Sequence, residues 1–108
     1  MSGIIGLYNL DGRPADQLLL ERMARTIAHR GPDGIRYWLE GPLGFGHLRL
    51  QTTPESAHET QPLTSPDGTL CLTLDGRIDN RKELAHLLDS EGSPPRDDTD
   101  AELVLRAY

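Results

Sequence analysis

The hydroxyl of Ser2 is the first side chain in the sequence with the chemistry of a nucleophile. It precedes residues 3–6, a short run of small and apolar residues at the end of the chain. Chain ends usually fray, and a frayed tail would be polar, so this composition predicts a buried strand with Ser2 at its tip. Ser2 is therefore a nucleophile, the remnant of one, or a residue without a chemical role.

The candidate metal ligands do not form a metal site. They are the four histidines and the single cysteine: His29, His47, His58, His86 and Cys71. No two of the histidines lie four residues apart on one face of a predicted helix, so the sequence predicts no metal site. Asp97 and Asp98 precede a predicted helix, where acidic residues are favoured by the helix dipole, and we interpret them as solvated. Residues 3–6 lack the glycine and lysine pattern of a phosphate-binding loop.

The composition is that of one small acidic domain. The chain has 108 residues, of which 36% are hydrophobic, and a net charge of −6. Nucleic acid binding needs clustered Lys and Arg, and a membrane span needs about 20 apolar residues. The sequence has neither feature, and it has no secretory signal. A single cysteine excludes an internal disulfide, so we expect a cytoplasmic protein that binds neither nucleic acid nor membranes.

A strand and a helix form the first predicted block. Residues 4–8 are a short apolar strand, and Asp11 with Gly12 marks a turn. Pro14 opens a helix that runs to Ala28, as proline does at a first helical position. The predicted buried face consists of Leu19, Leu20, Met23 and Ile27.

Two strands and a long loop follow this helix. We expect strands at residues 35–39 and 43–50 and a loop at residues 51–65. Gly44 and Gly46 lie inside the second of these strands, which predicts either a close approach of another group or a bulge.

The last third of the chain is a strand and two helices. The strand is predicted at residues 70–74, the helices at residues 80–89 and 100–108, with a loop at residues 90–98 between them. Each helix has a capping pair, Asn80 with Glu83 and Thr99 with Glu102. This order of elements predicts an α+β domain with a mostly antiparallel sheet.

Six motifs occur in order along the chain, at residues 1–6, 29–34, 46–50, 61–63, 75–80 and 99–102. Their order resembles the class II glutamine amidotransferase domain at the N-terminus of asparagine synthetases, and the resemblance covers nearly all 108 residues. The His-Arg-Gly-Pro-Asp-Gly motif is fairly specific to that family. The resemblance implies the N-terminal nucleophile fold, an αββα sandwich of antiparallel sheets between helical layers. Residues 1–108 would be about the first half of that domain.

The resemblance assigns roles to three positions. The family begins Met-Cys-Gly-Ile, and after Met removal the cysteine attacks the glutamine amide with its own α-amino group as base. Ser2 has this position here, although a hydroxyl is a poorer nucleophile and Met1 holds the Ser2 amine in a peptide bond. Arg49 matches the arginine that binds the glutamine carboxylate, and Asp100 the aspartate that receives the α-ammonium. In an inactive domain these two residues persist as an ion pair or as structural groups.

The oxyanion motif of the family, Asn-Gly-Glu-Ile-Tyr-Asn, is altered here. Its first Asn donates to the oxyanion, but Asp75 is a carboxylate that accepts hydrogen bonds and repels negative charge. Loss of one such donor costs roughly 2.7–4 kcal/mol. Gly76 is kept, so its backbone N–H can still donate. Arg77 replaces the Glu of the motif and reverses the charge at the pocket rim, and Asp79 replaces the Tyr.

Changes at Ser2, Asp75 and Arg77 affect the nucleophile, the oxyanion hole and the pocket, so we expect that glutamine hydrolysis is lost. Such degenerate domains are known in asparagine-synthetase-like ligases that need no ammonia, including β-lactam synthetases and the macrolactam cyclases of lasso peptides. The implied role is structural, beside a C-terminal synthetase domain outside these residues that forms an amide bond with ATP and Mg. We expect no cofactor within residues 1–108.

Two alternatives stay open. The first is a functional asparagine synthetase that hydrolyses glutamine with Ser2 as its N-terminal nucleophile, and only this form would need glutamine as a ligand. The second is a non-enzymatic interaction module, whose signature would be a sheet that lacks the Ser2 strand beside the Arg49 and Gly76 segments. A half-domain with an open sheet edge and an apolar face also predicts a homodimer.

Overall fold

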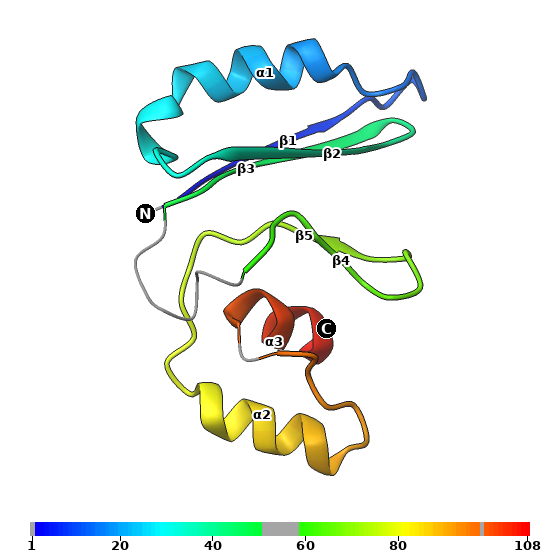
Figure 1. Cartoon of the computed structure of the whole chain (residues 1–108). Coiled ribbons are helices and arrows are strands. Elements are labelled where there is room, and N and C mark those ends of the chain that lie inside the picture. Colours follow the sequence, from blue (N-terminus) through cyan, green and yellow to red (C-terminus); the bar gives the residue numbers. More distant parts are fainter. Residues whose placement is uncertain (1, 51–58, 98) are drawn as a thin grey trace.

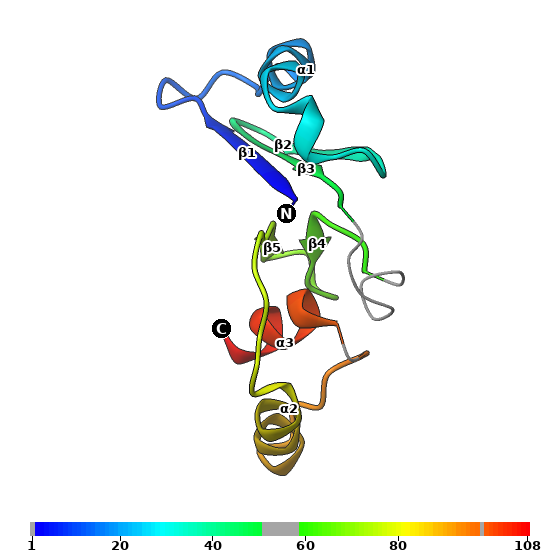
Figure 2. The ribbon, with the colours of Figure 1, turned by 90° about the vertical axis from the view of Figure 1, so that its left-hand side faces the viewer.

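A computed structural model of the chain describes residues 2–50, 59–97 and 99–108. Helix α1 (Gln17–Thr26) covers one face of a three-stranded sheet, and a two-stranded sheet lies on the side away from α1. Helices α3 (Asp100–Ala107) and α2 (Arg81–Ser90) lie beyond the smaller sheet, as Figure 1 and the rotated view in Figure 2 show. Both sheets are antiparallel, which confirms the expected α+β class. None of the described helices combines the length and the apolar character needed to cross a membrane.

The larger sheet has the order β1-β3-β2 and an unbroken register. Its strands are β1 (Gly3–Tyr8), β2 (Ile35–Glu40) and β3 (Leu43–Leu48), within two residues of the expected bounds. Gly46 lies between Ile5 and Tyr37 in the register, and a Cβ at Gly46 would lie 2.7 Å from Ile5 Cγ1. Of the two readings of this glycine, close approach is therefore correct and a bulge is not.

Helix α1 begins later than expected, and Leu19, one of the four residues of its expected buried face, is exposed. It is capped by Asp16, whose carboxylate accepts a hydrogen bond from Leu18 N at 2.9 Å, so the prediction that Pro14 opens the helix is wrong. Leu20 and Ala24 are its buried residues, whereas Leu19 is 37% exposed. The reason is Gly44, because a Cβ there would lie 2.8 Å from Leu20 Cδ1. The glycine leaves a hollow that accepts Leu20 and fixes the rotation of the helix.

The smaller sheet is shorter than expected. It pairs β4 (Leu63–Thr64) with β5 (Cys71–Leu72), so the predicted strand at residues 70–74 is reduced to two residues and β4 lies in the predicted loop. Residues 51–58 of that loop are outside the described part of the chain. Leu74 N donates to the side-chain oxygen of Gln61. A side chain thus satisfies a backbone group that a longer strand would have paired.

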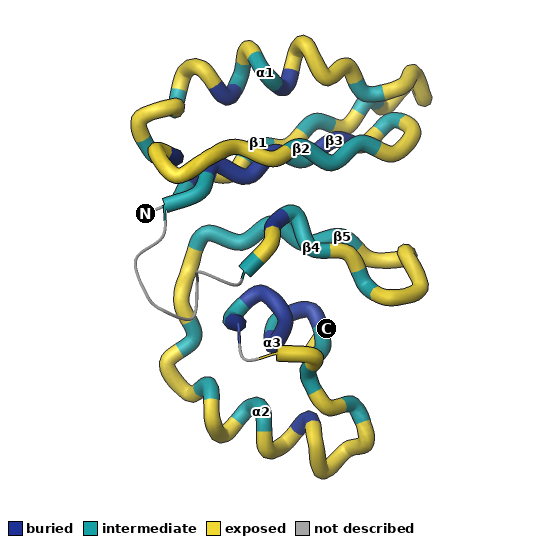
Figure 3. The backbone as a smooth tube through the Cα atoms, in the orientation of Figure 1, coloured by how far each residue is buried: buried dark blue, intermediate teal, exposed yellow. Residues whose placement is uncertain are grey.

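The two C-terminal helices pack against each other and form a second core. Thr99 caps α3 by accepting a hydrogen bond from Glu102 N, as the capping box predicts. The Asn80 side chain makes no capping bond to α2, so that expectation is wrong. Ser90, expected in the loop, is the last residue of α2. The buried residues of α3 are Ala101, Glu102, Leu103 and Leu105, visible as the dark segment in Figure 3.

Candidate functional site

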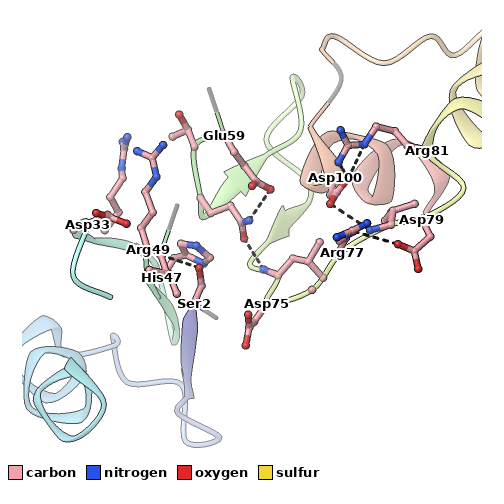
Figure 4. A pocket seen from close by; sticks show the side chains of 18 of the residues that line it. Ser2, Asp33, His47, Arg49, Glu59, Asp75, Arg77, Asp79, Arg81 and Asp100 are labelled. Atoms are coloured by element: carbon pink, nitrogen blue, oxygen red, sulfur yellow. Dashed lines mark hydrogen bonds and ion pairs between the residues drawn. The ribbon is translucent and has the colours of Figure 1, made fainter. Parts of the chain in front are cut away.

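One cavity of about 1040 Å³ is lined by all six site residues that the sequence predicts. They are Ser2, Arg49, Asp75, Gly76, Arg77 and Asp100. Figure 4 shows Ser2 and Arg49 on the wall that the larger sheet supplies and Asp100 on the opposite wall, beside Arg81. Segments far apart in the sequence therefore meet around a single cavity, and the loop between β5 and α2 connects its two walls.

Ser2 is held by contacts to both its backbone and its side chain. The hydroxyl oxygen accepts a hydrogen bond from Leu50 N at 3.0 Å. The backbone carbonyl of Ser2 accepts from Nε and Nη2 of Arg30 at 3.2 and 3.1 Å. These bonds fix the end of β1 at the cavity. The position of Ser2 is therefore set by Leu50, the second residue after β3, and by the short 3-10 helix Ala28–Arg30.

Asp75 is paired with the same arginine. Nη2 of Arg30 lies 3.2 Å from Oδ2 of Asp75, and the Asp75 side chain is only 20% exposed. A single guanidinium therefore bridges the Ser2 carbonyl and the Asp75 carboxylate. Because an ionised carboxylate only accepts hydrogen bonds, this side chain offers no donor to the cavity.

Asp100 is bound by Arg81. Its Oδ1 accepts from Nε and Nη2 of Arg81 at 3.0 and 2.7 Å, and its Oδ2 accepts from Ile78 N at 3.2 Å. The Asp100 side chain is 13% exposed. Asp100 thus forms an ion pair with Arg81, and Arg49 lies across the cavity (Figure 4).

Arg77 and Asp79 form a rim pair. Nε of Arg77 lies 3.2 Å from Oδ1 of Asp79, and their side chains are 77% and 87% exposed. Two positions at which the sequence departs from the family motif thus contact each other. Exposed pairs of this kind contribute at most about 1 kcal/mol to stability. Their main effect is therefore on the charge at the mouth of the cavity.

Two further titratable groups line the cavity, the buried His47 and the half-buried Glu59. His47 is 6% exposed and its Nδ1 lies 3.1 Å from Thr73 Oγ1. Burial lowers the pKa of His47, Asp75 opposes this shift and Arg49 adds to it. Burial raises the pKa of Glu59, although Ala101 N at 3.2 Å and the Gln61 amide at 2.8 Å donate to its carboxylate. The lowered pKa of His47 favours the neutral form of its imidazole.

Sequence reasoning did not single out Arg30, Arg81 and Glu59, although all three bind residues of the site. Arg30 belongs to the motif at residues 29–34, which is a weak signal for it. Arg81 carries a clearer one, because it is a cation at the first position of a helix, where the dipole disfavours positive charge. Glu59 has no signal in the sequence.

The whole chain, residues 1–108, matches the family model described as the glutamine amidotransferase domain. The protein therefore belongs to the glutamine amidotransferase domain family. The antiparallel sheets and flanking helices fit this assignment.

Similar curated proteins are several times longer than this chain. Asparagine synthetase [glutamine-hydrolyzing] 1 of Bacillus subtilis is 34% identical over 111 residues, which cover 100% of this chain and 17% of that protein. Asparagine synthetase [glutamine-hydrolyzing] 1 of Arabidopsis thaliana is 29% identical, with 100% and 18% covered. Glutamine--fructose-6-phosphate aminotransferase [isomerizing] of Thermus thermophilus is 30% identical, with 96% and 21% covered. The chain thus spans about a fifth or less of the length of most of these relatives.

Proposed function

We propose that this amidotransferase domain has lost glutamine hydrolysis and serves as a structural part of an amide-forming ligase. The observation that supports this most strongly is the Arg30–Asp75 pair beside Ser2. Hydrolysis builds negative charge on the amide oxygen, and this charge needs hydrogen-bond donors. Loss of one oxyanion donor lowers the rate by about 10²–10³-fold, and the carboxylate of Asp75, which is ion-paired to Arg30, supplies no donor in its place.

The nucleophile position supports the same conclusion. Ser2 supplies a hydroxyl, which ionises far less readily than a thiol at neutral pH. The hydroxyl oxygen of Ser2 also accepts a hydrogen bond from Leu50 N. This bond occupies a lone pair of the atom that would have to attack the amide. The Arg77–Asp79 pair then changes the charge at the rim.

The ligase is proposed from the relatives and from the resemblance. Two of the relatives reported above are named as asparagine synthetases, and this chain corresponds to 17–18% of their length. We therefore assign ATP and Mg to a C-terminal synthetase domain, which would be the partner of this chain. Macrolactam or β-lactam formation is the branch of this chemistry that needs no ammonia, and a domain without hydrolysis suits it.

Ammonia release from L-glutamine tests the proposal. The full chain, with Met1 removed so that the Ser2 amine is free, should release no more ammonia than its Ser2→Ala variant. The Bacillus subtilis asparagine synthetase, assayed in parallel, provides the positive control. Ammonia release by the natural chain that disappears in Ser2→Ala would overturn the proposal.

That second outcome would establish the alternative, an active enzyme with Ser2 as nucleophile. The alternative has support in Gly76, whose backbone N–H is available as an oxyanion donor in the sequence motif, and in the shared cavity of Ser2, Arg49 and Asp100. An interaction module that only shares motifs has no such support. Its signature, a sheet without the Ser2 strand near Arg49 and Gly76, is the opposite of the observed arrangement.

A further inference from the structure

Arg81 and Asp100 form an ion pair in the wall of the cavity. Two nitrogens of the guanidinium donate to one carboxylate oxygen, and the other oxygen receives Ile78 N. Both side chains are mainly buried, with 26% and 13% exposed. The three donors come from the loop before α2 and from its first residue, while the acceptor is the first residue of α3. The contact therefore closes one wall of the cavity (Figure 4).

Helix α2 itself gives no reason for a cation at this position. Arg81 is its first residue, and positive charge at a helix N-terminus is unfavourable by about 0.3–1 kcal/mol. Asp100 has the opposite situation, because an anion at the first residue of α3 is favoured by the dipole. Asp100 thus holds Arg81 at a position that the dipole of α2 disfavours, whereas the dipole of α3 already favours Asp100 where it lies.

A carboxylate in this state has little capacity for a second cation. An ionised carboxylate has about four lone-pair sites, and three donors occupy Asp100 already. The guanidinium also neutralises its charge, so an incoming ammonium would meet a cation rather than an anion. Displacing the arginine would break its two charged hydrogen bonds to Asp100, which is costly.

From this geometry we infer that Arg81 is a specificity-determining residue that makes the cavity reject ligands with an α-ammonium group. The inference rests on the proposed function in one respect, since a domain that still bound glutamine for hydrolysis would need this carboxylate. The ligand class that the cavity then accepts carries a carboxylate or an amide but no adjacent cation. Arg81 has this effect because its guanidinium occupies the hydrogen-bonding sites of Asp100. Removal of the guanidinium should therefore abolish the discrimination against the α-ammonium group.

Two probes that differ only in the α-amino group test this inference. L-Glutamine carries the group, and glutaramate (4-carbamoylbutanoate) has the same chain without it. Their affinities are measured by calorimetry on the full chain and on Arg81→Ala. The natural chain should bind L-glutamine no more tightly than glutaramate. Arg81→Ala should prefer L-glutamine by about tenfold or more, the usual size of a charged hydrogen bond.

Two further variants show whether the preference depends on Asp100. Adding Asp100→Asn to Arg81→Ala should abolish the preference for L-glutamine. Lys82→Ala removes the same charge from the neighbouring, exposed residue at the cavity and should produce no preference. Circular dichroism verifies that each variant is folded, and Arg81→Gln replaces Arg81→Ala if the latter is not.

The Arg81 variant and the natural chain can each give a result that overturns the inference. A folded Arg81 variant that binds the two probes equally, or binds neither, overturns it. So does a natural chain that prefers L-glutamine more than threefold, a result that needs no variant. Because the readout is a ratio of affinities, it is separate from ammonia release: hydrolysis by the natural chain would refute the proposed function, whereas the probe ratio refutes the role of Arg81.

Discussion

Arg30 has contacts with two parts of the site at once. Its guanidinium donates to the Ser2 carbonyl and to Asp75. One side chain therefore holds the end of β1 and the loop after β5 in place. Arg30 is 37% exposed and Asp75 20%, which is intermediate between a surface pair and a buried one. For that reason the pair should contribute to stability, but modestly.

A double-mutant cycle measures this contribution. Arg30→Met and Asp75→Asn should each lower the free energy of unfolding by about 1 kcal/mol, with a coupling energy of about 0.5–1 kcal/mol between them. Urea denaturation of the four proteins gives the values. The exposed pair of Arg13 and Asp11, at 84% and 59%, serves as a matched control with a coupling near zero. Equal coupling in both pairs would contradict the bridging role of Arg30.

The site residues could be predicted from the sequence better than their partners. Ser2, Arg49 and Asp100 line one cavity, and each belongs to a motif that is visible in the sequence. The contacts of Arg30 and Arg81 join residues 45 and 19 positions apart. Nothing in local spacing encodes such distances, because they depend on how the layers pack.

At the scale of elements, α3 is fastened by a buried carboxylate. Glu102 is 1% exposed and receives Nη2 of Arg96 at 2.9 Å and Nε of Arg106 at 2.8 Å. Burial alone would raise the pKa of Glu102, but the hydrogen bonds from Arg96 and Arg106 outweigh it and hold the pKa at about 2. The capping box explains the start of α3, whereas this network attaches the helix to the loop before it.

The depressed pKa of Glu102 predicts a loss of stability in acid. A folded pKa of about 2 against an ordinary value of 4.5 means that the stabilisation is complete above pH 4.5 and is lost as the pH falls toward 2. The shift corresponds to a contribution on the order of 3 kcal/mol. Glu102→Gln should flatten the dependence of unfolding free energy on pH in this window, while Glu83→Gln, on the exposed side of α2, should not. Identical pH profiles for both variants would refute the assignment.

The elements were predictable where a local signal controls them. The apolar run at residues 4–8 predicted β1, the segments at residues 35–39 and 43–50 predicted β2 and β3, and the Thr99 cap predicted the start of α3. The exposure of Leu19 in α1 was not predictable, because the hollow at Gly44 accepts Leu20 instead of its neighbour. The length of β5 was not predictable either, because a distant side chain, Gln61, binds Leu74 N.

At the scale of the whole molecule, one face of the larger sheet is partly uncovered. Gly3 faces α1, since a Cβ there would lie 3.0 Å from Ile27 Cδ1, so the alternating residues Ile4 and Tyr8 point to the other face. Ile4 is 46% exposed and Tyr8 62%, and Leu43, which pairs with Tyr8, is 37% exposed. Exposed apolar side chains grouped on a sheet face favour association.

Self-association of the chain through this face remains a prediction. Sedimentation velocity at increasing concentration should reveal a reversible dimer. The double variant Ile4→Thr with Tyr8→Thr should weaken it by at least tenfold, since both side chains lie on the proposed contact. Leu10→Thr, in a turn and 87% exposed, is the matched control and should leave it unchanged. A natural chain that stays monomeric throughout would exclude the dimer.

The loop between β5 and α2 is anchored near both ends by ion pairs of opposite polarity. The loop contributes the anion, Asp75, near one end, and Arg81, the first residue of α2, is the cation at the other end. Under the proposed function, this arrangement makes a gain of hydrolysis depend on more than the catalytic positions. An Asp75→Asn change would remove the counter-ion of Arg30, and a thiol at position 2 would leave Arg81 bound to Asp100. Engineering hydrolysis into this chain would therefore also require changes at Arg30 and Arg81.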